Sequence, residues 1–168
     1  GVAWLLGASG RIVRVNLETQ AWDAIGPLPE GSGEILSIAP YGEDTAWFAG
    51  TTQDSPTRGL LMRLDAAGNQ RSWRRYSVHS LEQRLLSGTA YARDKAWVAG
   101  ERSLLHVTAQ RTSIEAEASS VTAEDLPGFS AFDADIAWAL GRTGTVLRTD
   151  NGGLEWQRTA GSVPAAVA

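Results

Sequence analysis

The sequence predicts an all-β protein of the β-propeller class, built from four blade repeats of four short antiparallel strands. An Ala-Trp pair recurs at Trp4, Trp47, Trp97 and Trp138, at intervals of about 40 to 50 residues that are typical of propeller blades. The apolar runs around these pairs are short, rich in Val, Leu, Ile, Trp and Thr, and bounded by Gly, Asp and Asn. Helical repeats of similar period would show longer amphipathic runs, so the pattern favours strands.

The first repeat, residues 1–26, begins abruptly. Strands are expected at 2–7, 11–17 and 20–25, and no innermost strand precedes Trp4. Because a propeller blade normally has four strands, the first blade is predicted to lack its inner strand.

The next three repeats, about 33–78, 84–119 and 127–161, each contain all four predicted strands. In each repeat the Ala-Trp pair lies in the second strand, and an outer strand follows the third. Residues 46–50 are small or apolar on both faces of the strand, as expected of a strand packed between two neighbouring sheets. The predicted strands are 33–41, 45–51, 58–65, 70–77, 84–92, 95–101, 103–109, 112–118, 128–134, 136–141, 144–150 and 154–160.

The tail, residues 162–168, is similar to the start of another innermost strand. It could pair beside residues 2–7 and close a four-bladed ring, since propellers often mix strands from both ends of the chain to remove exposed edges. It could instead begin a fifth blade of a longer protein, or pair with a second chain. Residues 1–168 are therefore expected to form a single propeller domain or a fragment of one.

The composition argues against several classes of function. The 168 residues are 43% hydrophobic, which is enough for a buried core, and the chain has no cysteine that could form a disulfide or ligate a metal. His79 and His106 are isolated in the sequence, and no run approaches the length of a membrane span. The formal net charge of -4 gives no reason to expect nucleic acid. We expect no cofactor, no metal, no nucleic-acid partner and no membrane-spanning segment in this chain.

The most specific motif runs from Thr149 to Trp156 and reads TDNGGLEW. It resembles an Asp-box, the S/T-x-D-x-G-x-T-W hairpin of BNR-repeat propellers. Together with the preceding AWALGRTGTVLRT, it also resembles the blades of photosystem II stability/assembly factors of the Ycf48/HCF136 type, which have seven blades. Two positions depart from the box, because Asn151 stands where Asp is expected, directly after Asp150, and Glu155 replaces the usual Thr or Ser.

A structural role is expected for this hairpin. The side chain of Asp150 or Asn151 can accept hydrogen bonds from turn N–H groups, glycine permits positive φ, and the tryptophan packs the hairpin onto its blade. The residues assigned to the Asp-box are Thr149, Asp150, Asn151, Gly152, Gly153 and Trp156.

Basic residues recur at one position of the repeat. Arg14, Arg63 and Arg148 end the apolar run that follows the Ala-Trp strand, and His106 takes this position in the third repeat. We expect these side chains to be solvated at strand ends, with a ring around one rim as the alternative.

A local basic cluster with aromatic residues lies in the outer strand of the second repeat. Strand alternation places Arg71, Trp73 and Arg75 on one face and Arg74 and Tyr76 on the other. These residues could bind an acidic partner or an anionic headgroup by stacking and bidentate pairing. The alternative is a charged edge strand that discourages aggregation.

No catalytic constellation is recognised, so a non-enzymatic protein is predicted. BNR-repeat propellers include sialidases, which need an arginine triad, an acid/base Asp and a Tyr nucleophile paired with Glu. Tyr41, Tyr76 and Tyr91 do not lie in such a setting.

The resemblance implies a protein-binding scaffold, an assembly or accessory factor of a larger, membrane-associated complex. It also implies an extracytoplasmic location in the periplasm, in a lumen or outside the cell, a protein partner that could be a membrane-complex subunit, a link to photosynthesis, and no small-molecule substrate. The alternative is a glycan-binding or sialidase-derived BNR propeller domain.

Overall fold

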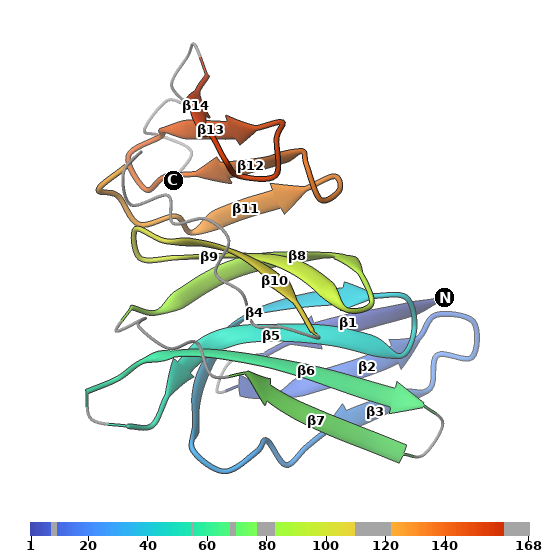
Figure 1. The fold of residues 1–168 in the computed structure, drawn as a ribbon. Coiled ribbons are helices and arrows are strands. Elements are labelled where there is room, and N and C mark those ends of the chain that lie inside the picture. Colours follow the sequence, from blue (N-terminus) through green and yellow to red (C-terminus); the bar gives the residue numbers. More distant parts are fainter. Residues whose placement is uncertain (8–9, 55, 68–69, 77–82, 110–121, 160–168) are drawn as a thin grey trace.

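The structure is a computed structural model that describes residues 1–7, 10–54, 56–67, 70–76, 83–109 and 122–159. These residues form four antiparallel sheets, each made of strands that follow one another along the chain. The sheets stack in chain order, like the blades of a propeller (Figure 1). The structure therefore confirms the predicted fold class.

Blade one contains β1 (Val2–Leu6), β2 (Ile12–Asn16) and β3 (Trp22–Ile25), paired in the order β1-β2-β3. Among the described residues no innermost strand precedes β1, in agreement with the sequence. The tail, residues 162–168, lies outside the described residues, so its pairing beside β1 stays a prediction.

Blade two has all four predicted strands, β4 (Ser32–Tyr41), β5 (Thr45–Thr52), β6 (Gly59–Ala67) and β7 (Gln70–Tyr76). Every residue of β5 is buried, because other sheets cover both of its faces. The register of β4 shifts near Ile35. A β-carbon on Gly50 of β5 would lie only 2.0 Å from the carbonyl oxygen of Glu34, so this close approach requires glycine.

Blade three contains β8 (Leu85–Ala92), β9 (Lys95–Gly100) and β10 (Leu104–Thr108) within the described residues. The predicted outer strand at 112–118 lies outside them. Blade four contains β11 (Gly128–Ala131), β12 (Ala137–Leu140), β13 (Val146–Thr149) and β14 (Gln157–Arg158). Its outer strand is shorter than the predicted 154–160, because the turn of the TDNGGLEW hairpin extends to Trp156.

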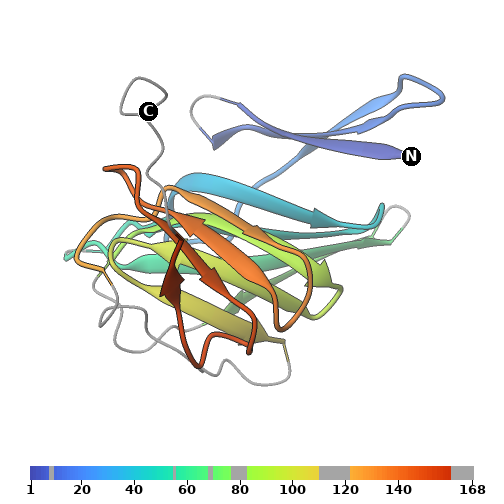
Figure 2. The same ribbon diagram turned by 90° about the horizontal axis from the view of Figure 1, so that it is seen from above.

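The hydrophobic cores lie between neighbouring blades. We call the tryptophans of the Ala-Trp pairs, Trp4, Trp47, Trp97 and Trp138, the repeat tryptophans. In each core, the repeat tryptophan of one blade packs together with the residue that follows the repeat tryptophan of the next blade. These pairs are Trp4 with Phe48, Trp47 with Val98, and Trp97 with Ala139. Each blade thus turns its tryptophan toward the next blade and the following residue toward the previous one. The two views place blade one beside blade two, and blade four beside blade three (Figures 1 and 2).

Candidate functional site

A basic side chain lies beside the repeat tryptophan in every blade. The strand register places Arg14 opposite Trp4, Arg63 opposite Trp47, His106 opposite Trp97 and Arg148 opposite Trp138. In the three arginine pairs the guanidinium carbon lies 5.8, 5.9 or 6.0 Å from the indole centroid, within cation–π range. The His106 ring stacks on Trp97 with centroids 4.2 Å apart.

This arrangement corrects the expectation that these arginines are solvated strand ends. Arg63 is only 8% exposed, and Arg14 reaches blade two, where it pairs with Asp44 at 3.0 Å. The repeated arginines therefore serve packing within and between blades.

Asp65 joins blades two and three through its carboxylate. It accepts hydrogen bonds from Arg63 at 2.7 and 3.1 Å, from Thr45 at 3.2 Å, and from Arg93 of blade three at 3.3 and 3.4 Å. Burial by itself would raise the pKa of Asp65, but the hydrogen bonds and charges of these partners hold that pKa below its ordinary value of 3.8. At neutral pH this carboxylate is therefore ionised. It links the two blades through its hydrogen bonds and does not act as a proton donor.

The TDNGGLEW hairpin uses its polar side chains within its own turn. Thr149 Oγ1 accepts hydrogen bonds from the N–H groups of Gly153 at 3.0 Å and Asn151 at 3.4 Å, and it donates to Asn151 Oδ1 at 3.0 Å. Asn151 Oδ1 also accepts from the N–H of Glu155 at 3.0 Å. Gly152 and Gly153 have φ of 72° and 85°, the left-handed region that favours glycine.

The other two Asp-box residues contact the blade that carries the hairpin and its neighbour. Asp150 pairs with Arg148 of β13 at 2.9 Å. Trp156 packs edge-on against Trp97 of blade three, with ring centroids 6.0 Å apart. Both contacts hold the hairpin in place, and neither creates an open polar site.

The predicted partner-binding cluster on β7 divides between two blade interfaces. On one face, Arg71 pairs with Asp23 of blade one and donates to the carbonyl of Ala24 at 3.1 Å. Arg75 donates to the carbonyl of Glu30 at 3.2 Å, in the linker after blade one. This face of β7 therefore fastens blade one to blade two.

The remaining residues of this cluster differ in exposure. Trp73 is half-buried against Phe48, with ring centroids 5.0 Å apart. Tyr76 is buried and stacks on Trp47 at 5.2 Å, and burial raises the pKa of its hydroxyl above 10.0. Arg74 is exposed on the other face. The use of these five residues by a partner stays a prediction.

A set of exposed arginines that the sequence analysis did not single out lies at the turn between the second and third strand of each repeat. We call this set the arginine rim; it consists of Arg11, Arg58, Arg102 and Arg142. The repeat tryptophan strands run in the same sense in all blades, so the turns that follow them lie on one side of the propeller. Within the described part of the chain, only Arg142 of this set has an acidic partner, Asp125 at 3.6 Å.

Contacts between turns and linkers connect successive members of the arginine rim. Arg142 donates its backbone N–H to the carbonyl of Asp125 at 3.0 Å, and Asp125 forms a bridge with Glu101, the neighbour of Arg102. Glu101 also pairs with Arg84 at 3.3 Å, in the linker after blade two. The same linker reaches Gly59, where a β-carbon would lie 2.7 Å from the carbonyl oxygen of Gln83. Arg58, Arg102 and Arg142 thus lie along one continuous surface.

The turns on the opposite side of the propeller expose apolar side chains. Tyr41 lies at the end of β4, Phe132 between β11 and β12, and Leu154 in the hairpin before β14, and all three are exposed. The N–H of Gly152 donates to the carbonyl of Asp135 at 3.1 Å, which brings the last two turns together. The two sides of the propeller therefore differ in chemistry, because one is rich in arginine and the other presents apolar and acidic turns.

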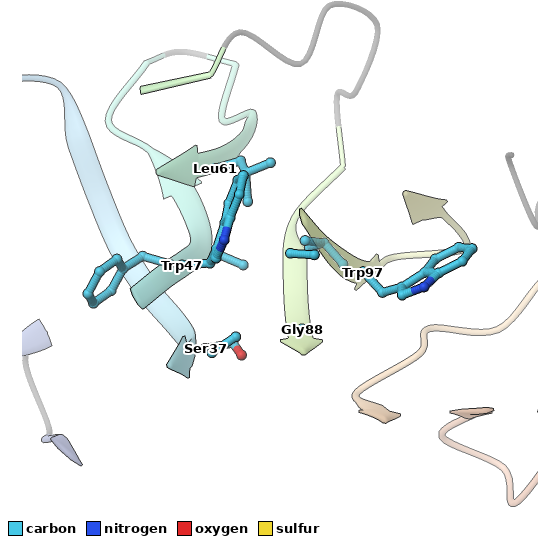
Figure 3. A pocket seen from close by; sticks show the side chains of 10 residues that line it. Ser37, Trp47, Leu61, Gly88 and Trp97 are labelled. Carbon is cyan, nitrogen blue, oxygen red and sulfur yellow. The ribbon is translucent and has the colours of Figure 1, made fainter. Parts of the chain in front are cut away.

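A small cavity lies between blades two and three (Figure 3). It has a volume of about 10 Å³ and is lined by residues that include Ser37, Trp47, Leu61 and Gly88. This space holds about one water molecule, so it is too small for a substrate. Among the described residues there is also no group of three or more His, Asp or Glu side chains that could hold a metal. No described helix has the length and apolar character needed to cross a membrane.

Neither a protein-family model nor a curated protein matches the sequence. Solved structures match the fold. A structure of YCF48 bound to a D1 peptide has a TM-score of 0.60 and 19% identity, covering 77% of this chain and 41% of that chain. A catalytically inactive virginiamycin B lyase from Staphylococcus aureus, solved with quinupristin, has a TM-score of 0.53 and 11% identity, covering 97% and 70%. YCF48 from Cyanidioschyzon merolae matches with a TM-score of 0.44 and 16% identity, covering 94% and 66%.

The first two likenesses, with TM-scores of 0.60 and 0.53, show the fold, a β-propeller. The chain spans less than half, 41%, of the length of the YCF48 chain that was solved with a peptide. One matched propeller is thus a peptide-bound protein and another is a lyase, so the fold alone does not choose between binding and catalysis.

Proposed function

We propose that this chain is a non-catalytic protein-binding scaffold, an assembly or accessory factor of a larger, membrane-associated complex, and that it binds its partner through the arginine rim. The observation that carries the proposal is the exposed arginine at the same turn of every blade. The other repeated polar residues are occupied within the fold, since Arg14 and Arg63 pair with acids and Thr149 and Asn151 bond their own turn. Binding residues commonly collect on such loops, which a rigid scaffold positions.

The chemistry of the rim indicates an acidic partner segment. A guanidinium group presents N–H donors in a planar fork that matches a carboxylate. Arg11, Arg58 and Arg102 have no acidic partner within the described residues, so their donors are available to another protein. YCF48, which shares the fold, was solved with a D1 peptide. For this chain the partner is an acidic segment of a membrane-complex subunit, and the two proteins bind outside the cytoplasm.

The catalytic alternative finds less support in the described residues. Tyr41 is exposed at a turn and Tyr76 is buried against Trp47. Tyr91 contacts His106. Within the described residues, neither Tyr41 nor Tyr76 is paired with a Glu, as the Tyr nucleophile of sialidases is. The arginine rim could also bind the carboxylate of an acidic sugar. The test must therefore distinguish glycan binding from binding of an acidic peptide.

The test is a titration of fluorescent peptides with the purified chain. One probe is a peptide rich in Asp and Glu, the second is the same peptide with these residues changed to Asn and Gln, and the third is a sialylated oligosaccharide. We expect the acidic peptide to bind, and to bind more weakly as the salt concentration rises. The double variant Arg58→Gln/Arg102→Gln should weaken this binding about tenfold, at roughly 0.7 kcal/mol per exposed ion pair.

The matched control removes two exposed arginines outside the rim, in the variant Arg74→Gln/Arg158→Gln. It should bind the peptide as the unmodified chain does. If the control loses binding and the rim variant keeps it, the contact surface lies on the β7 side and the rim is not the site. If the chain binds the oligosaccharide and ignores both peptides, the glycan-binding alternative replaces the proposal.

A further inference from the structure

The turn between β9 and β10 holds one member of the arginine rim in a backbone conformation that usually requires glycine. The N–H of Gly100 donates to the carbonyl of Ser103 at 2.9 Å, so the turn consists of two residues, Glu101 and Arg102. Arg102 has a φ of 62°, in the left-handed region that residues with a β-carbon disfavour. A turn that needs positive φ at its second central residue commonly has glycine there.

Blades one and four have glycine at the equivalent position. Their turns between the second and third strand of the repeat contain Gly10 and Gly144, with φ of 72° and 90°. Each glycine directly precedes the residue whose carbonyl closes the turn, as Arg102 does in blade three. Glycine therefore suits this turn in two repeats, and blade three has an arginine where glycine would fold with less strain.

The turn that carries Arg102 is fixed against the linker after blade two. Glu101 donates its N–H to the carbonyl of Arg84 at 3.0 Å, and its carboxylate accepts from the N–H of Arg84 and pairs with the Arg84 guanidinium, both at 3.3 Å. A β-carbon on Gly100 would lie only 2.5 Å from the carbonyl oxygen of Arg84, so the linker and the turn are in close contact. The backbone of Arg102 is thus ordered before a partner binds, which lowers the entropic cost of binding.

The side chain of Arg102 contributes no polar contact to the described part of the fold. It is exposed, and no hydrogen bond or ion pair joins it to another described residue, whereas Arg142 pairs with Asp125. Positive φ alone does not mark a binding residue, since the only other described non-glycine residue with positive φ, Gln20, lies in a turn on the opposite side of the propeller. At Arg102 the strained backbone coincides with an available guanidinium, between Arg58 and Arg142 on the rim.

We propose that Arg102 is the anchor of the arginine rim, and that it binds a carboxylate of the acidic partner segment at the junction of blades two and three. This inference rests on the proposed function and names the contact on which partner binding mainly depends. Residues in strained backbone conformations cluster at ligand-binding sites, and a few residues carry most of the energy of an interface. The other rim arginines contribute mainly long-range attraction.

The test measures the melting temperature of single variants and their affinity for the peptide rich in Asp and Glu. Arg102→Gly relieves the strained φ and removes the guanidinium. It should raise the melting temperature by about 1 to 4 °C, after the entropy that glycine adds to the unfolded chain, and weaken binding about fivefold. Arg102→Gln keeps the strain and removes the charge, so it should weaken binding equally without raising the melting temperature.

Two further variants serve as comparisons. Arg58→Gln should weaken binding at most about twofold, so that the two single losses multiply to the loss of about tenfold expected for the double variant. Gln20→Gly is the matched control, because it relieves a φ of 58° in the turn between β2 and β3, away from the rim. It should raise the melting temperature as Arg102→Gly does and leave peptide binding unchanged.

Equal losses of binding for Arg102→Gln and Arg58→Gln would overturn the proposal, because the rim arginines would then contribute alike. A lower melting temperature for Arg102→Gly would also overturn it, since the arginine would then stabilise the fold itself. If the unmodified chain binds no acidic peptide, the proposed function fails and the anchor fails with it. If the unmodified chain binds the peptide and Arg102→Gln binds it as tightly, the anchor alone is wrong.

Discussion

Replacing Thr149 by valine is expected to lower the free energy of unfolding by about 1 to 3 kcal/mol. Valine keeps the shape of this 2% exposed side chain but removes its hydroxyl. The buried N–H of Gly153 then loses its acceptor at 3.0 Å, and Asn151 loses a donor at 3.0 Å and an acceptor at 3.4 Å. An unsatisfied buried donor costs more than the net gain of an average hydrogen bond, which sets the upper part of the range.

Urea unfolding followed by tryptophan fluorescence measures this change. Thr57→Val is the matched control, since Thr57 is exposed in the turn before β6, and it should stay within about 0.5 kcal/mol of the unmodified chain. A Thr149→Val chain as stable as this control would refute the view that the hairpin depends on its own hydrogen bonds. An increase of the melting temperature on adding calcium would refute it in another way, because the Asn151 amide would then serve a cation.

Three other changes test the packing. Trp97→Ala should cost about 3 to 5 kcal/mol in the same assay, because its buried ring packs in the core of blades three and four, whereas the exposed Phe132→Ala should change stability by less than about 0.5 kcal/mol. Gly50→Ala should cost about 1 to 3 kcal/mol, since its new methyl group would meet the Glu34 carbonyl oxygen, and a neutral result would contradict the close approach. The folded-state pKa of Asp65 lies below 3.8, so its stabilising contribution is complete above the unfolded-state pKa and is lost as the pH falls through the folded-state pKa. Between pH 5 and 3 the Asp65→Asn chain should therefore lose less stability than the unmodified chain, and equal losses would contradict the assignment.

The blades were predictable because each strand signal is local. The Ala-Trp pairs mark the central strands, and the apolar runs that follow mark the strands that pair with them. The strand order of blade two could therefore be predicted from the sequence. The alternation of Arg71, Trp73 and Arg75 on β7 was predictable for the same reason, since side chains of a strand alternate between its faces. The neighbours of these residues were not predictable, because Asp23 and Glu30 reach β7 only through the stacking of blades.

The arginine rim could not be predicted from the sequence, for a different reason. Its members lie in turns of unequal length, so Arg11, Arg58, Arg102 and Arg142 do not stand at a fixed distance from the repeat tryptophans. Strands must keep register to pair, whereas turns can change length without disturbing the blade. The signal was an arginine one to four residues before each third strand, and it becomes visible only when the turns are aligned by their place in the fold.

The Trp138–Arg148 pair shows which features belong to a blade and which belong to its neighbours. The arginine lies over the indole in blade four at 6.0 Å as it does in blade two at 5.8 Å, although Trp138 is exposed and Trp47 is buried. Strand register alone therefore forms the pair, and burial is added by whatever sheet stands next to it.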